Sequence, residues 1–255
     1  MDESVDMDAI VVGGLEPATW YYFVRAQIDL LSIHVHDIEE QIDKAIKAYQ
    51  SEKEATQVEH DDDGYPTVVL EEHREIEAPP DHLEEIFEYY FPNLLRRGTL
   101  ITLFSFFEHE LNQLCELFAT TQKMNVVQTD SKDRGIDRSR HYLKKVMPLP
   151  IANNSVIWQE IKSIQKVRNV VVHNDAKLDP KADDKGVIEI VKRAKYLSLA
   201  SENDRDIKND ELSVYELEVL EVNILEGYLT HVLDTCDSYC SELNKAIELS
   251  EPSII

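Results

Sequence analysis

The sequence is poor in the features that mark membrane proteins, secreted proteins and the common nucleotide-binding enzymes. It contains no apolar run close to the length of a membrane span, and its acidic N-terminus is unlike a signal peptide. Its 3 cysteines cannot build a disulfide framework, so we expect a protein of a reducing compartment, the cytoplasm. A Walker loop, a GxSxG turn and a dinucleotide-binding fingerprint are also missing from the sequence.

Positive charge is scarce as well, but it is concentrated in one part of the chain. The formal net charge is −24, yet residues 92–200 hold 18 basic and 12 acidic side chains. The flanking segments, 1–91 and 201–255, carry net charges of −19 and −11. A basic segment suits a phosphate-binding surface, because nucleic-acid affinity comes largely from neutralised phosphates. The alternative is a set of ordinary solvated helix faces. The candidate phosphate-binding residues are Arg138, Arg140, Lys144, Lys145, Lys162, Lys166 and Lys177.

Apolar residues recur mainly at helical spacing, and an apolar content of 43% is enough for a core. We therefore predict an all-α fold, a helical bundle of about five to six helices over residues 16–255. Residues 1–15 are expected to be disordered, and residues 51–80, which contain HDDDGYP and PP, to form an acidic loop. The run GVIEIV fits a strand or a helix, so a small β-hairpin near 187–212 is left open.

Local start and stop signals place the individual helices. The first long helix is predicted to turn a stripe that includes Gln27 and His34 toward the core. The expected helices are a long one from Pro17 to about Tyr49, a short one from Asp81, one from Pro92 to about Gln122, a basic one over about 136–146, one over 158–172, and a last one that begins after Ser213 and contains Leu220.

The most informative segment is RNVVVH at residues 168–173, which closes the predicted helix over 158–172. The apolar stripe of this helix runs through Ile161 and Ile164, and its next step falls on Arg168. An arginine directed at the interior costs several kcal/mol unless it is paired or faces a polar cleft. The alternative is a surface arginine followed by His173, a helix-terminal histidine that the helix dipole favours.

This motif and its setting resemble the HEPN superfamily, whose members are small helical bundles carrying R-x(4–6)-H with a polar residue, often Asn, after the Arg. By that resemblance Arg168, Asn169 and His173 take the motif positions. The run LFSFFEHEL is similar to the helix that sets an acidic residue beside the motif in several HEPN groups. Glu108 is then the candidate to orient Arg168 or His173, and a boundary glutamate in contact with water is the alternative.

The resemblance implies a metal-independent endoribonuclease of toxin–antitoxin or phage-defence type, without a cofactor. Cleavage through the 2′-hydroxyl needs a base, an acid and positive charge on the phosphorane, which histidine and arginine supply. Because one motif holds one histidine, we expect a homodimer with a composite site. An antitoxin or regulatory protein is a further expected partner. The alternative is a non-catalytic HEPN module that binds a nucleotide or a protein.

One residue departs from the family pattern. Some HEPN toxins extend the motif to R-x4-H-x-Y, and a partner enzyme modifies that tyrosine. Here the corresponding position is Asp175. Neutralisation by that modification therefore does not carry over to this chain.

Overall fold

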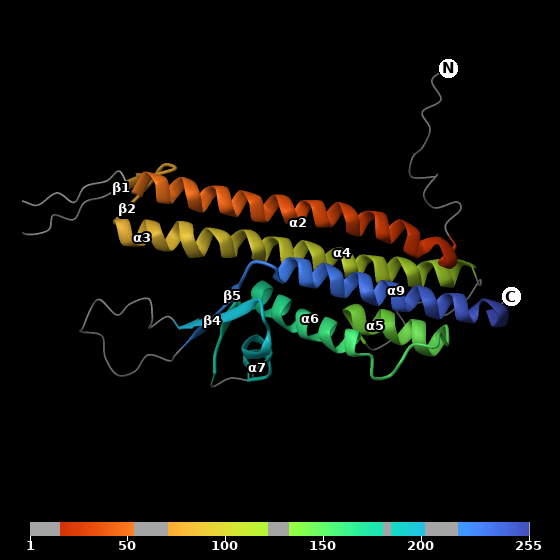
Figure 1. Cartoon of the computed structure of the whole chain (residues 1–255). Helices are drawn as coiled ribbons and strands as arrows, with labels where there is room; N and C mark the ends of the chain where they lie inside the picture. The colour runs from red at the N-terminus through yellow and green to blue at the C-terminus, as the bar shows by residue number, and fades with distance from the viewer. Residues whose placement is uncertain (1–15, 54–70, 122–132, 181–184, 202–218, 255) are drawn as a thin grey trace, which may run out of the picture. The chain divides into compact units, whose positions relative to one another are not determined.

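The computed structural model describes residues 16–53, 71–121, 133–180, 185–201 and 219–254, and Figure 1 shows their helices and strands. The longest helices are α2 (Pro17–Lys53), α4 (Phe91–Thr121), α6 (Val156–Asn174) and α9 (Tyr228–Ile254). The predicted mostly α-helical bundle is confirmed. In the part of the chain that the structure describes, no helix is both long and apolar enough to cross a membrane. The predicted disorder of residues 1–15 lies outside the described residues.

Within the region predicted as one helical domain, 16–255, the chain forms two compact units. Unit 1 comprises Met1–Ser32, Thr102–Lys166 and Thr230–Ile255, and unit 2 comprises Ile33–Ile101 and Val167–Leu229. Helices α2, α4, α6 and α9 each contribute residues to both units.

Unit 1 has an aromatic and aliphatic core. Tyr239 of α9 packs between Phe107 of α4 and Trp158 of α6, with ring centroids 6.0 and 5.1 Å away. The predicted basic helix is confirmed as α5 (Gly135–His141), which continues as the π-helical turn η3 (Tyr142–Val146). The start of α6 is capped by Ser155, whose hydroxyl accepts a hydrogen bond from the Trp158 N–H at 3.2 Å.

Helix α2 begins where the sequence predicts, but its buried stripe is shifted by one residue in two places. Gln27 and His34, predicted on the stripe, are exposed, whereas Ile28 and Val35 are buried. The buried and half-buried apolar positions alternate by four and three residues, a seam that averages 3.5 residues per turn. These positions are Val24, Ile28, Leu31, Val35, Ile38, Ile42, Ala45 and Tyr49.

In unit 2 the segment before α4 is helical without a break. Helix α3 (Pro80–Glu85) passes into the π-helical turn η1 (Ile86–Tyr90), and the Phe91 N–H then donates to the Ile86 carbonyl. The predicted new start at Pro92 is therefore a widened turn instead. Proline has no N–H and its ring clashes with the carbonyl four residues earlier, so a widened turn accommodates it.

The prediction of a loop throughout 51–80 is wrong at both ends. Residues 51–53 belong to α2, and strands β1 (Glu71–His73) and β2 (Ile76–Ala78) form an antiparallel hairpin. Its two turn residues, Arg74 and Glu75, have φ angles of 51° and 65°, which is typical of a type I′ hairpin turn. Buried His73 packs its ring on Phe87, with centroids 4.4 Å apart. Residues 54–70 lie outside the described residues.

Unit 2 also contains a three-stranded antiparallel sheet in the order β3–β5–β4. The strands are β3 (Lys177–Leu178), β4 (Leu197–Ser201) and β5 (Leu220–Ile224). The possible β-hairpin near 187–212 is therefore only partly confirmed. Residues 185–193 form helix α7 (Lys185–Arg193), and β4 pairs with β5. The expectation that Leu220 belongs to the last helix is wrong, since α9 begins at Tyr228. Periodicity alone does not separate a short apolar strand from a helix turn.

The core of unit 1 can be tested with two leucines of α9. Leu243 is 0% exposed and Leu249 is 73% exposed. We expect Leu243→Ala to lower the free energy of unfolding by about 2–5 kcal/mol, because it removes buried methyl groups and leaves a cavity. Leu249→Ala is the matched control and should change it by about 0.5 kcal/mol or less. Urea denaturation measures both, and equal losses would contradict the assigned core.

Candidate functional site

The three motif residues lie in the last two turns of α6, in unit 2. Arg168 is half-buried, and its Nη1 donates a hydrogen bond to Oδ1 of Asn169 at 3.2 Å. Asn169 and His173 are exposed. The buried stripe of the helix continues through Val167 and Val171, so the expectation that the stripe reaches Arg168 is wrong by one residue. Arg168 borders the core and its polar end is held by Asn169.

The end of α6 turns sharply just after His173. Asp175 and Ala176 both have left-handed backbone conformations, with φ angles of 51° and 62°. The Ala176 N–H donates to the carbonyl of Val170 at 3.2 Å, and the Ala176 carbonyl accepts from the Val222 N–H at 2.9 Å. Aspartate tolerates this conformation better than most residues. The turn leads directly into β3, which begins with the predicted phosphate ligand Lys177.

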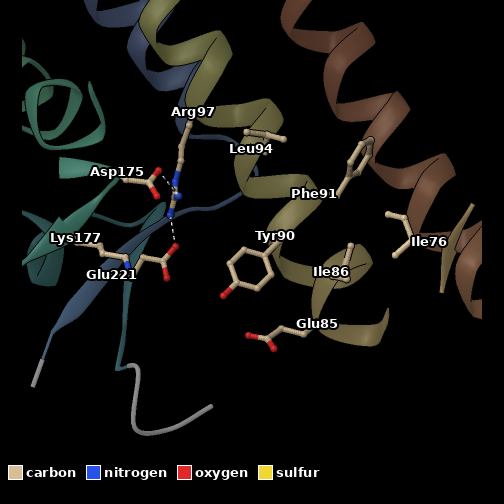
Figure 2. Close-up of a pocket in the computed structure, with 10 residues that line it drawn as sticks. All are labelled: Ile76, Glu85, Ile86, Tyr90, Phe91, Leu94, Arg97, Asp175, Lys177 and Glu221. Atoms are coloured by element: carbon tan, nitrogen blue, oxygen red, sulfur yellow. Dashed lines mark hydrogen bonds and ion pairs between the residues drawn. The ribbon is translucent and has the colours of Figure 1, made fainter. Parts of the chain in front are cut away.

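A pocket of about 710 Å³ lies within unit 2, at this turn (Figure 2). Asp175, Lys177 and Glu221 line it from the turn and the sheet. Arg97 and Tyr90 line it from α4 and η1. Among the described residues, Lys177 is the predicted site residue that lines this pocket, whereas Arg168, Asn169 and His173 do not. The apolar lining residues are Ile76, Ile86, Phe91 and Leu94.

Arg97 organises the charged wall of the pocket. Its Nη2 contacts Oε1 of Glu221 at 2.5 Å and the Val222 carbonyl at 3.1 Å, and its Nη1 lies 3.8 Å from Oδ1 of Asp175. The side chains of Arg97 and Glu221 are 12% and 7% exposed, so they form a buried pair. The Asp175 side chain is 86% exposed and is held only loosely. The pocket therefore offers one open carboxylate beside a neutralised one.

Sequence analysis did not assign Arg97, Glu221 or Tyr90 to a site. The available signal was the pair Arg96 and Arg97 inside the otherwise apolar start of α4, since buried arginines need acceptors. Arg97 finds its acceptor, Glu221, 124 residues away in strand β5, whereas Arg96 binds Glu39 of α2, 57 residues away, as well as the Ile224 carbonyl of β5. No periodicity connects such distant segments.

Glu108 lies in unit 1, where it is half-buried. Its Oε1 is 3.2 Å from the position that a Cβ would occupy at Gly135, the first residue of α5, whose φ is +55°. The carboxylate thus lies close against the α5 backbone. Glu110, two residues further along the helix, is buried. The orienting role of Glu108 stays a prediction.

The predicted phosphate-binding residues of unit 1 differ in how far they are engaged. Lys162 is paired with Asp137 at 2.5 Å. The Arg140 guanidinium lies 4.4 Å from the Trp158 ring centroid and donates to the Ala152 carbonyl at 2.9 Å, so it contributes to the local structure. The other predicted residues of this unit are half-buried Arg138, half-buried Lys144, exposed Lys145 and exposed Lys166.

Like charges gather on η3. Burial and the neighbouring charges of Arg140 and Lys145 lower the pKa of Lys144. The Lys144 ammonium also hydrogen-bonds the side-chain oxygen of Asn153. A group of cations that repel one another is stabilised when an anion binds between them. Lys144 and Lys145 therefore stay candidates for phosphate binding in unit 1.

No family model, no curated protein and no solved structure matches the chain. Its function therefore has to be argued from its own residues.

Because Glu110 is buried, its carboxyl group should make the stability of the fold depend on pH. Burial raises the pKa of Glu110, so the folded state prefers the neutral acid, and keeping the carboxylate ionised costs stability as the pH rises. We expect Glu110→Gln to raise the urea midpoint at about pH 8, and this gain should shrink at about pH 4, where the wild-type acid takes up its proton. Exposed Glu116→Gln, on the same helix, should show neither effect. A Glu110→Gln protein that is less stable at both pH values would contradict the assignment.

Proposed function

We propose that the protein is a metal-independent endoribonuclease of the HEPN type. The observation that carries this proposal is the arrangement at the end of α6, where the Arg168 guanidinium is held by Asn169 and His173 is exposed in the last turn. A guanidinium suits phosphate oxygens and stays charged, and a histidine can serve as a base or an acid. These are the groups that RNA cleavage without a metal requires.

The reaction would proceed through the 2′-hydroxyl of the RNA. A base takes the proton of this hydroxyl, its oxygen attacks the adjacent phosphorus, and the bond from phosphorus to the 5′-oxygen breaks. An acid protonates that oxygen, so the products carry a 2′,3′-cyclic phosphate and a 5′-hydroxyl. Arg168 binds the phosphate oxygens and offsets the charge of the transition state, while His173 serves as base or acid. Asn169 holds Arg168 in place.

The motif supplies one histidine per chain, which is too few for both proton transfers. We therefore propose a homodimer in which each chain supplies His173 to a composite site, which an isologous two-fold interface permits. Lys144, Lys145 and Lys166 are the candidates for contacts with the RNA backbone. In this proposal the enzyme acts in the cytoplasm as a toxin or phage-defence effector, and an antitoxin or regulatory protein would restrain it.

The role of His173 is tested by cleavage of mixed RNA in the presence of EDTA. We expect His173→Ala to lower the cleavage rate by about 10²–10⁴-fold, because proton transfer is lost. His34→Ala, which changes an exposed histidine of α2, is the matched control and should leave the rate unchanged. Product ends should be 2′,3′-cyclic phosphates. Equal cleavage by wild-type and His173→Ala protein would refute the proposal.

The same experiment separates the alternative function, a non-catalytic module that binds a nucleotide through Arg168. That reading is supported by the guanidinium held by Asn169, which suits a phosphate without any turnover. It predicts intact RNA with the wild-type protein, together with nucleotide binding that survives His173→Ala and is lost with Arg168→Ala.

The composite site makes a separate prediction. If each site takes a histidine from both chains, an excess of His173→Ala chains should draw wild-type chains into inactive mixed dimers. We expect the cleavage rate per wild-type chain to fall by about tenfold at a tenfold excess after subunit exchange. Light scattering establishes whether the protein is a dimer. An unchanged rate, with mixed dimers demonstrated, would show that each chain acts alone.

A further inference from the structure

The unit 2 pocket has two chemically different walls, and Tyr90 stands between them in Figure 2. One wall is apolar, with Ile76, Phe91 and Leu94. The other carries Arg97, Asp175, Lys177 and Glu221. A volume of about 710 Å³ lies in the range of small-ligand sites, about 300–1,000 Å³. A ligand that fills the pocket would therefore need both an apolar face and a polar edge.

The charges of the lining restrict what can enter. Two cations, Arg97 and Lys177, are outnumbered by three carboxylates, those of Glu85, Asp175 and Glu221. This balance disfavours a phosphate group inside the pocket. Glu221 is buried and bound by Arg97 at 2.5 Å, so it is already satisfied. Of the other two carboxylates, Glu85 is half-buried and Asp175 is 86% exposed, so Asp175 is the acceptor that an incoming group meets first.

A carboxylate has two oxygens side by side and accepts two parallel N–H bonds best. Among the RNA bases, guanine presents two neighbouring N–H donors, N1–H and the 2-amino group, on its Watson–Crick edge. Adenine and cytosine place a ring-nitrogen acceptor beside their single amino group, and uracil flanks its N–H with two carbonyls. Each of these three would bring a lone pair against a carboxylate. The exposed ring of Tyr90 gives a surface for stacking, the usual way in which proteins hold unpaired bases.

We propose that this pocket recognises a guanine base of single-stranded RNA, with Asp175 as the acceptor of its Watson–Crick edge and Tyr90 as its stacking partner. The choice of RNA as the ligand rests on the proposed ribonuclease function. Asp175 follows His173 by two residues, and its left-handed backbone is fixed by the Ala176 contacts to α6 and β5. A guanine bound by Asp175 would thus be held by a residue two positions after the proposed catalytic histidine. The base specificity of cleavage would be set there.

The test measures binding in the full-length His173→Ala protein, which keeps the RNA intact. Fluorescein-labelled short oligouridines with a single central G, A, C or U are titrated, and fluorescence anisotropy gives the dissociation constants. We expect the G-containing oligonucleotide to bind about tenfold more tightly than the other three. Adding Asp175→Asn should remove this preference, because the amide replaces one acceptor oxygen by a donor. Asp234→Asn, an exposed aspartate of α9, is the matched control and should preserve it.

Tyr90 provides a second variant that does not disturb the carboxylate. Tyr90→Phe should retain the binding of the G-containing oligonucleotide, whereas Tyr90→Leu should weaken it severalfold by loss of stacking. Equal binding of all four oligonucleotides, or a G preference that survives Asp175→Asn, would overturn the proposal. Circular dichroism of each variant checks that the fold is intact.

The outcomes for the pocket and for the enzyme are distinct. Cleavage by the wild type with no base preference would overturn the guanine pocket and leave the ribonuclease standing. A G preference in binding, without any cleavage by the wild type, would overturn the ribonuclease and leave the pocket as a nucleotide-binding site. Failure to bind any of the four oligonucleotides would overturn the pocket.

Discussion

The structure of unit 2 depends on the attachment of strand β5 to helix α4 by two adjacent arginines. Arg97 binds Glu221 and the Val222 carbonyl, and Arg96 binds Glu39 and the Ile224 carbonyl. The two arginine side chains are each only 12% exposed. Removing one member of a buried ion pair leaves an uncompensated charge and costs about 3–5 kcal/mol. These contacts therefore define where the strand lies along the helix more than they add net stability.

The position of β5 also determines the conformation of Asp175 and Ala176, which follow the motif helix. β5 is the central strand of its sheet, and its Val222 N–H binds the carbonyl of Ala176. In the register of the sheet, Lys177 of β3 lies opposite Glu221. The turn at residues 175 and 176 therefore has little freedom, and the Asp175 carboxylate is kept near Arg97. A charged pair inside the core thus shapes the surface beside the proposed catalytic histidine.

A shift of one residue in the buried stripe of α6 changes the surroundings of the motif arginine. With Arg168 on the apolar stripe, its burial would need a polar cleft to offset the cost of desolvation. In the structure Val167 takes that place, and Arg168 sits at the border of the core with Asn169 as its acceptor. The burial cost is then modest. The functional argument rests on the pairing of two side chains and on the exposure of His173.

The sequence alone determined the mostly helical fold, the start of α2 and the placement of the motif at a helix end. These features follow from local periodicity and from bonds between residues a few positions apart. Tertiary structure decided that residues 220–224 form a strand, that His34 is exposed, and that Arg97, Tyr90 and Asp175 line one pocket. Strand pairing leaves no periodic signal in the sequence, and neither does the ion pair between Arg97 and Glu221, which are 124 positions apart. Only the folded chain brings these residues together.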